Sequence, residues 1–373
     1  MSPGSPDLTI RTGAEQFEQF LPLLEGRNVG VVANHTSQVG NTHLVDSLLS
    51  RGVAVVRAFG PEHGFRGTHG AGDKVSDGKD PSTGIPVVSL YGSNKKPTKE
   101  QLDGIDIVVF DIQDVGARFY TYISTLFYVM ESCAELDIPV LVLDRPNPHS
   151  GYVDGPVLED GFQSFVGICR IPVVHGLTVG EFARMVNGEG WLSGEKAAEL
   201  HVVKALNYKH GDHYVIETSP SPNLQDMEAI MLYPSLCFFE GTPVSIGRGT
   251  SHPFKVYGYP GMQPSDTVFT PETIEGVVSS PKFNGVLCNG VYLGDKAGEI
   301  TSAGKLKLDF LVKVYEGYPD KENFFTPFFD KLAGTDKLRN QITSGMSAEE
   351  ISGSWQKDLE AYKKVREQYL LYP

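Results

Sequence analysis

The sequence is short of basic residues and of long apolar runs, and each shortage excludes a class of protein. Among its 373 residues, 32 are Lys or Arg and 46 are Asp or Glu, so the formal net charge is −14. Such a chain repels phosphate backbones and has no basic stripe, so we expect no nucleic acid partner. No stretch is apolar for long enough to cross a bilayer, so we expect no membrane span.

The sequence also has few cysteines and no pattern of metal ligands. Its four cysteines stand far apart and form no Cys-x-x-Cys pair, which argues against a zinc knuckle and against a disulfide scaffold. The histidines, His69 among them, follow no HExxH or comparable spacing. We therefore expect no bound metal.

Three common site motifs are missing as well. No GxGxxG follows the first apolar run, where the chain reads VANHTSQVG, and neither GxxxxGK[ST] nor GxSxG occurs. A dinucleotide-binding protein, a P-loop enzyme and a serine hydrolase therefore lose their main support. We expect no cofactor.

What the first part of the chain does contain is an alternation of strand and helix patterns. Apolar runs typical of buried strands occupy residues 28–34, 53–59, 86–90, 105–112 and 139–144. Apolar residues recur at helical spacing between them, at residues 42–50, 99–102 and 121–136. Because strands that alternate with helices form a parallel sheet, this pattern predicts an α/β fold.

This pattern continues past residue 150 and then stops. A further apolar run at 171–176 leads into a helix that Thr178 and Glu181 open as a capping box. Near Ser219 the chain reads SPSPNL, which is typical of a crossing between domains. A chain of this length favours two domains, and we place them at residues 8–220 and 221–373.

The second, smaller domain is predicted to be α+β. Short strands are expected at residues 242–246 and 284–291, followed by a helix over 348–371. Apolar residues of that helix, including Ile351 and Trp355, fall on one face. We expect this stripe to dock the helix on the protein.

Polar residues stand directly after four of the predicted strands. These are Asn34 and His35, then Glu62 and His63, then Asp111, Asp114 and Arg118, and finally Arg145 and Asn147. Ligands of open parallel sheets bind beyond the carboxyl ends of the strands, so we expect these side chains to meet at one site. The glycine-rich loop 60–67 suits a tight turn that holds Glu62 against a ligand, although Glu62 could instead pair with Arg66 or cap the next helix.

Two further groups of polar residues leave more than one interpretation open. The stretch 238–254 places Glu240, Arg248 and His252 among glycines, as in a cleft wall or in an ordinary turn with surface charges. Asp111 and Asp114 could bind a metal, act as a base or fix their loop by accepting backbone hydrogen bonds. Of these three roles we favour loop fixing.

A series of segments in this order makes the chain similar to a known family. The segments are VVANHTSQV, FGPEHGFRG, VVSLYG, DIVVFDIQDVGARFYTYISTL, VLDRPNP and FFEGTPVSIGRGT. Together they resemble the exo-β-N-acetylmuramidase family, long catalogued as a domain of unknown function, and the resemblance covers nearly the whole chain. It implies a Rossmann-like parallel-sheet domain, a smaller C-terminal domain and a cleft between them. No nicotinamide cofactor is implied.

The resemblance also implies a reaction and a catalytic residue. The expected activity is a glycoside hydrolase that releases terminal N-acetylmuramic acid (MurNAc) from the non-reducing end of peptidoglycan-derived saccharides such as MurNAc-GlcNAc. In that family the glutamate of the PEHG segment is the proposed catalytic residue, and it matches Glu62. Glycosidases typically use two carboxyl groups, and for the second we prefer Glu240, then Asp111 and Asp114. Alternatively, the 2-acetamido group of MurNAc attacks its own anomeric carbon.

The remaining polar residues are candidates for substrate binding. They are Asn34, His35, His63, Arg66, Arg118, Tyr120, Asn147, Arg248 and His252. The lactyl carboxylate of MurNAc calls for an arginine, whose planar fork donates two parallel hydrogen bonds. We rank Arg66 and Arg118 first for this contact, and expect Arg145 to hold a loop instead.

Two other functions remain open at this point. A metal-dependent amidohydrolase or deacetylase of amino sugars could be built from His35, His63, Asp111 and Asp114, and a muropeptide-binding protein would keep the cleft without turnover. We expect a periplasmic or secreted location, with the cytoplasm as the alternative, although no export signal stands in this sequence. The oligomeric state is left open.

Overall fold

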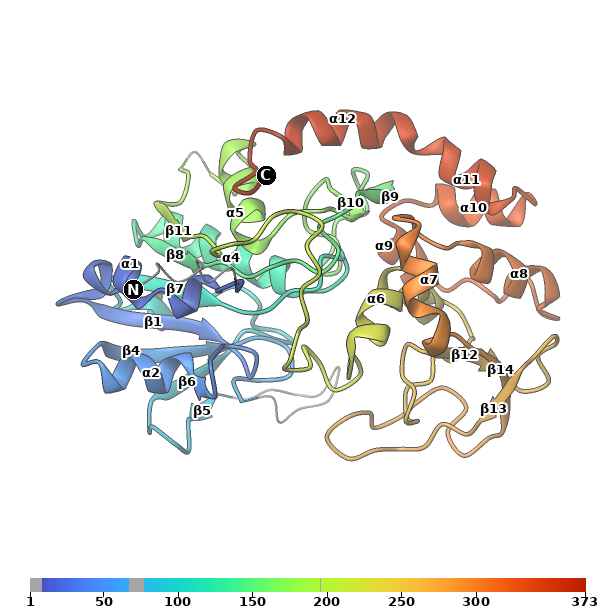
Figure 1. Ribbon diagram of the computed structural model, residues 1–373, viewed down its shortest axis with the longest axis horizontal. Helices are drawn as coiled ribbons and strands as arrows, with labels where there is room; N and C mark the ends of the chain where they lie inside the picture. Colours follow the sequence, from blue (N-terminus) through green and yellow to red (C-terminus); the bar gives the residue numbers. More distant parts are fainter. Residues whose placement is uncertain (1–8, 67–76, 195) are drawn as a thin grey trace, which may run out of the picture.

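The computed structural model describes residues 9–66, 77–194 and 196–373. These residues form two parts, a sheet with its helices and a second part that carries most of the C-terminal half (Figure 1). The last helix, α12 (Gln356–Arg366), extends from the second part back toward the first.

A seven-stranded sheet forms the centre of the first part. Its strands lie in the order β11-β8-β7-β1-β4-β6-β5. The six parallel strands are β1 (Asn28–Ala33), β4 (Ala54–Gly60), β6 (Pro86–Ser89), β7 (Ile107–Asp111), β8 (Val140–Leu143) and β11 (Leu200–Val203), and β5 (Gly78–Lys79) pairs antiparallel at one edge. This is the Rossmann order, and it confirms the predicted α/β class.

Helices cover both faces of the sheet, which explains why its central strands β1, β7 and β8 are mostly apolar. Val29 and Val31 of β1 pack in one buried cluster with residues of α1 (Phe17–Leu24) and α2 (Leu44–Ser50). Val32 packs on the other face with residues of α4 (Tyr122–Glu135) and α5 (Val179–Gly188). Smaller elements of this part are η1 (Gly13–Glu15), β2 (Gln38–Val39), β3 (Thr42–His43) and α3 (Lys99–Leu102).

The apolar run at 171–176 forms a strand, but it does not extend the parallel sheet. It contains β10 (Pro172–Val174), which pairs antiparallel with β9 (Asp154–Val157) in a separate two-stranded sheet. The sixth parallel strand is β11 instead, a half-buried edge strand whose sequence LHVV gives little apolar signal. The capping box before α5 is confirmed, since Glu181 N donates to Thr178 Oγ1 and Thr178 N donates to Glu181 Oε2.

The second part combines a small antiparallel sheet with short helices. Its elements are α6 (Met227–Leu236), η2 (Cys237–Gly241), β12 (Val256–Tyr259), β13 (Thr267–Phe269), β14 (Cys288–Tyr292), η3 (Gly294–Lys296), α7 (Ala297–Ser302), α8 (Asp309–Gly317), α9 (Pro327–Ala333) and α10 (Lys337–Thr343). The strand expected at 284–291 corresponds to β14. The strand expected at 242–246 is wrong, because this stretch forms only an isolated bridge between Ser245 and Gly258.

The predicted C-terminal helix is two helices, α11 (Ala348–Ser354) and α12, which meet at Trp355. The apolar stripe is buried as expected, with Ile351 and Leu359 almost wholly inaccessible. Trp355 Nε1 donates to Asp154 of β9 over 2.9 Å, and Tyr362 Oη donates to the His175 carbonyl over 2.8 Å. The stripe therefore docks the tail on the first part of the chain.

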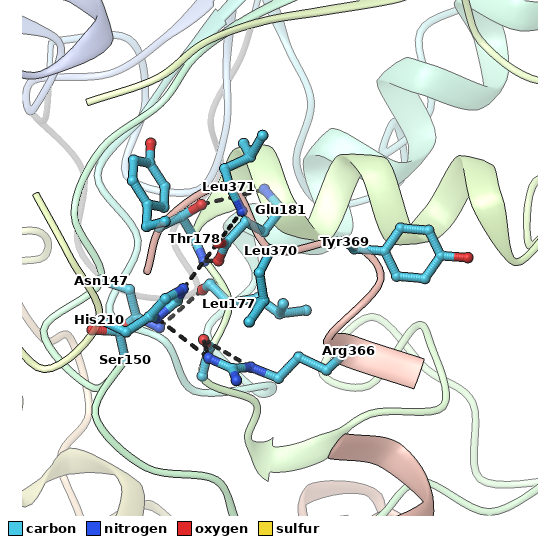
Figure 2. Close-up of polar contacts among 12 residues, drawn as sticks. Asn147, Ser150, Leu177, Thr178, Glu181, His210, Arg366, Tyr369, Leu370 and Leu371 are labelled. Carbon is cyan, nitrogen blue, oxygen red and sulfur yellow. Dashed lines mark hydrogen bonds and ion pairs between the residues drawn. The ribbon is translucent and has the colours of Figure 1, made fainter. Parts of the chain in front are cut away.

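The end of α12 and the residues after it attach to the first part through buried polar groups (Figure 2). Glu181 Oε1 accepts from the Leu371 backbone N–H over 2.8 Å and lies 2.9 Å from Nε2 of His210. Arg366 donates to the carbonyl of Gly176 over 2.6 Å. Glu181 is fully buried, so its contacts replace the hydration it loses, and together these bonds fix the C-terminal tail to the sheet domain.

Candidate active site

A cavity of about 780 Å³ lies where the two parts of the chain meet, at the carboxyl ends of β4, β6 and β7. The first part lines it with residues that include Glu62, His63, Tyr91, Phe119, Tyr120, Thr121 and Phe165. The second part adds residues that include Tyr233, Glu240, Arg248, Phe254 and Lys331. Its volume falls in the range of small-molecule sites, and we call it the cleft.

Glu62 enters the cleft from the turn that follows β4. The Tyr91 hydroxyl donates to its Oε1 over 2.9 Å, and the Thr121 hydroxyl donates to its Oε2 over 3.1 Å. The next residue, His63, is buried with a φ of 69°, which is uncommon for a residue with a side chain. The carboxylate of Glu62 is thus held in one orientation by two hydroxyls, one from the segment after β6 and one from the start of α4.

Glu240 enters the cleft from the opposite part of the chain, on η2. Its Oε1 accepts from Nε of Arg248 over 2.6 Å, and the two side chains remain 26% and 23% exposed. Burial lowers the pKa of Arg248, but the Glu240 carboxylate more than compensates and raises it above its usual value. The Lys282 ammonium donates to backbone carbonyls of this segment, including those of Phe239 and Thr242, and so fixes the loop. Two carboxylates from different domains therefore line one cavity.

Arg66 does not line the cleft in the way we expected. Its guanidinium forms paired hydrogen bonds to both Asp80 and Asp46, at distances of 2.7–3.1 Å. The Asp80 hydrogen bond is the main cause that raises the pKa of Arg66, and the same pair lowers the pKa of Asp80 to about 2 against the cost of burial. With both sides of its fork occupied, Arg66 holds its loop and is not a free clamp for a ligand.

Arg118 does not line the cleft either. It is fully buried, and its terminal nitrogens donate to the carbonyls of Pro156, Ile171, Leu332 and Ala333 at 2.7–2.9 Å. Burial lowers its pKa to about 9. Leu332 and Ala333 end α9, where the helix dipole favours a cation. The ranking of Arg118 as a substrate clamp is therefore wrong, and this residue links the two parts of the chain.

Asp111 is occupied by a buried ion pair. Arg145 Nε donates to its Oδ1 over 2.5 Å and Nη2 donates to its Oδ2 over 2.9 Å, with both side chains at least nine-tenths buried. Asp111 does not line the cleft among the described residues, so the structure gives it a loop-fixing role instead of a catalytic one. Arg145 holds a loop, as the sequence predicted.

Asp114 lies beneath the cleft without lining it. Its Oδ1 accepts from the Gly116 N–H over 2.7 Å, while its Oδ2 is buried with no hydrogen-bond partner in the described part of the chain. Burial raises the pKa of Asp114 to about 7, although backbone hydrogen bonds from Gly116 and Val115 act in the opposite direction. The arrangement matches the loop-fixing role that we favoured.

This raised pKa predicts a pH-dependent stability that Asp114→Asn removes. The folded protein keeps the proton up to about pH 7, whereas the unfolded chain releases it near 3.8, so the carboxyl lowers the free energy of unfolding as pH rises from about 4 to 7. Denaturant unfolding at pH 5 and pH 8 should show that the free energy of unfolding of the variant, relative to that of the parent protein, is about 2–3 kcal/mol more favourable at pH 8 than at pH 5. The exposed Asp103→Asn is the matched control, and equal behaviour of both variants contradicts the prediction.

The other expected ligand contacts divide between structural and peripheral positions. Asn34 and Asn147 are buried in turns, where Asn34 accepts from Thr36 and Asn147 donates to the Leu177 carbonyl. His35 lies 2.7 Å from the carbonyl of Ser219, and burial lowers its pKa. His252 is exposed and packs on Tyr292, away from the residues that line the cleft. Of the predicted substrate-binding residues, the cleft contains His63, Tyr120 and Arg248.

Several residues that line the cleft are not among the candidates that the sequence suggests. Tyr91 follows β6, so the strand-end rule applied to that strand would have found it. Thr121 precedes α4 and looked like part of the helix. Lys95, Phe165 and Lys331 lie on loops or on α9 with no recognisable motif, and no pattern in one sequence marks them.

The described residues contain no group of three or more His, Cys, Asp or Glu side chains that could hold a metal ion. His35, His63, Asp111 and Asp114, which the amidohydrolase alternative requires, are not brought together as a ligand set there. His69 lies outside the described residues. No helix in the described ranges has the length and apolar character of a membrane span.

Comparison with known proteins identifies the family of this chain. A family described as "Exo-beta-N-acetylmuramidase NamZ, N-terminal" matches residues 29–228, and its C-terminal counterpart matches residues 231–372. The chain belongs to the NamZ family. The peptidoglycan β-N-acetylmuramidase NamZ of Bacillus subtilis (strain 168) is 39% identical to it over 97% of this chain and 91% of that protein.

Two solved structures share this NamZ fold. A DUF1343 family protein from Bacteroides fragilis NCTC 9343 is 44% identical with a TM-score of 0.91, over 98% of this chain and 99% of that one. A second DUF1343 family protein from the same organism is 32% identical with a TM-score of 0.82, over 99% and 100% of the two chains. The family resemblance noted from the sequence is therefore confirmed, and this chain is a glycosidase of the exo-β-N-acetylmuramidase type.

Proposed function

We propose that this protein hydrolyses the glycosidic bond of a terminal MurNAc at the non-reducing end of peptidoglycan fragments such as MurNAc-GlcNAc. The observation that carries the proposal is the pair of carboxylates, Glu62 and Glu240, that line one cleft from opposite parts of the chain. Glycosidases use such a pair on either side of the bond that breaks. A cleft of about 780 Å³ is of a size to take a sugar.

The two carboxylates differ in their partners, and this difference suggests their roles. Glu240 is paired with the cation of Arg248, whereas Glu62 accepts hydrogen bonds from the hydroxyls of Tyr91 and Thr121. We assign Glu62 the proton transfer to and from the reacting oxygens. Glu240 then acts on the other face of the sugar as nucleophile, as base for water or as the group that orients the acetamido group.

Arg248 is our proposed partner for the lactyl carboxylate of MurNAc. Its Nε is bound to Glu240, but its two terminal nitrogens have no hydrogen bond to any residue that the structure describes. These nitrogens offer the planar pair of donors that a carboxylate requires. This assignment replaces Arg66 and Arg118, because the terminal nitrogens of both are bound to other groups.

Incubation with MurNAc-GlcNAc in the presence of EDTA tests the proposed function. Since no metal cluster occurs in the described ranges, we expect release of free MurNAc and GlcNAc at the rate seen without the chelator, read by mass spectrometry. A product that retains the disaccharide but loses acetate would identify a deacetylase. Tight binding of the disaccharide with no new product would identify a binding protein.

The domain boundary and the location of the protein in the cell are also part of this proposal. We propose residues 8–220 and 221–373 as the domains, and the break between the matched family regions at residues 228 and 231 supports a boundary near this point. We also propose a periplasmic or secreted location, because peptidoglycan fragments are the substrate class. Fractionation of cells that express the full native gene tests the location.

A further inference from the structure

A second cavity, of about 430 Å³, lies at a different point of the same sheet edge. It is lined by Thr36 and Gln38, which follow β1, by Gln113, which follows β7, and by Arg145, which follows β8. β1 and β7 are neighbours, and the chain order of the strands reverses between them. This reversal is the position at which open α/β sheets bind ligands, yet the cleft with Glu62 lies to one side of it.

The backbone segment 218–221 lies between the second cavity and the cleft, which share no lining residue among those described. Thr218 lines the second cavity, whereas Ser221 lines the cleft. Between them, the Pro220 carbonyl accepts hydrogen bonds from the hydroxyls of Tyr120 and Tyr122 at 2.8 and 3.0 Å. The two cavities are therefore distinct sites, and binding in the second cavity does not depend on the function proposed for the cleft.

Arg145 gives the second cavity a built-in carboxylate site. Its Nε and Nη2 are fixed by Asp111, while its Nη1 has no hydrogen bond within the described part of the chain. The side chain is 7% exposed, so the guanidinium is held rigidly at the cavity surface. It is the single Lys or Arg among the described lining residues. Apart from His213, Arg145 is therefore the one described lining side chain that can meet an anionic group with a positive charge.

The cavity is also lined by the acidic side chains Glu15 and Glu217 and by Tyr214. Burial is the main cause that raises the pKa of Tyr214; the charge of Arg145 lowers it, whereas those of Glu15 and Glu217 raise it, so charges of both signs act on this residue. Ile10 and Val215 add apolar surface between the polar groups. A ligand that pairs with charges of both signs needs a carboxylate and a cationic group.

We propose that this cavity binds a small zwitterion of dipeptide size. Its carboxylate pairs with Arg145, its ammonium group faces Glu15 and Glu217, and its side chains contact Ile10 and Val215. The amide groups of Gln38 and Gln113 lie at the cavity surface, where they can bind the central peptide unit. A volume of about 430 Å³ is in the range of small-molecule sites.

Titration calorimetry with alanyl-alanine tests this proposal. We expect one saturable site with a Kd below about 1 mM. The C-terminal amide of the dipeptide lacks the carboxylate and the N-acetyl form lacks the ammonium group, so each should bind at least about tenfold more weakly. Failure of alanyl-alanine to saturate in this range, or equal binding of all three compounds, would overturn the proposal.

Substitutions in the two cavities show which of them binds the dipeptide. Thr218→Phe fills the second cavity and should abolish binding, and Glu217→Gln should weaken it, whereas Arg248→Ala in the cleft should leave it unchanged. Arg145→Lys keeps a positive charge beside Asp111. It should weaken binding, because lysine lacks the separate Nη1 donor that arginine offers to the ligand carboxylate while its other nitrogens bind Asp111. Each variant is first shown to unfold cooperatively. Binding that survives Thr218→Phe but is lost in Arg248→Ala would place the dipeptide in the cleft and disprove the second site.

Discussion

Glu62→Gln should lower kcat on MurNAc-GlcNAc by roughly 10²–10⁴-fold while the protein remains folded. Glutamine has the shape of glutamate and still accepts from one of the two hydroxyls, Tyr91 or Thr121, that position the carboxylate. It cannot carry a proton to or from the reacting oxygen, so the variant should still bind the substrate but should no longer transfer the proton. The measurement is the initial rate of MurNAc release, with the melting temperature determined in parallel.

Two further variants make the result specific to Glu62. Glu316→Gln, on the exposed face of α8, makes the same chemical change away from the cleft and should leave the rate unaltered. Tyr91→Phe removes one of the two positioning hydroxyls and should cause a smaller loss, since the carboxylate itself remains. A Glu62→Gln enzyme that works at the normal rate would remove Glu62 from the mechanism and leave Glu240 as the principal carboxylate.

Most of the sheet could be predicted because its strands are buried on both faces. The runs that became β1, β7 and β8 are almost continuous apolar sequences, which leave little choice of structure. β11 was missed because an edge strand is half-buried and needs no such run. The run that became β10 was assigned to the wrong sheet, because an apolar pattern reports burial and contains no information on the partner strand.

The candidate site could be predicted only in part, for a related reason. The strand-end rule placed Glu62 and His63 correctly, because the carboxyl ends of parallel strands share one edge. The same rule could not distinguish residues that face the cleft from those that hold the loops, such as Asp111 and Arg118. That distinction depends on which polar group is satisfied by which partner, and the partners stand up to 215 residues apart in the sequence.

The preference for Arg248 over the other arginines leads to an expected change in substrate specificity. MurNAc differs from GlcNAc by a lactyl ether that carries a carboxylate, so the residue that binds this group should matter for one sugar and not for the other. Arg248→Ala should reduce kcat/KM on an aryl β-MurNAc substrate by about 10–150-fold relative to the matching GlcNAc compound, which corresponds to about 1.5–3 kcal/mol for a hydrogen-bonded charge.

The ratio between the two substrates is the decisive quantity, because Arg248 also contacts Glu240. Loss of that ion pair disturbs the carboxylate for both sugars alike and cancels in the ratio, whereas loss of the lactyl contact does not. Arg248→Lys keeps a cation beside Glu240 but lacks the planar fork, so it should recover much of the GlcNAc rate and less of the MurNAc rate. Lys331→Ala removes another cationic side chain of the cleft and serves as the comparison. If Arg248→Ala slows both substrates equally while Lys331→Ala changes the ratio, the lactyl group binds Lys331, and Arg248 serves only to hold Glu240 in place.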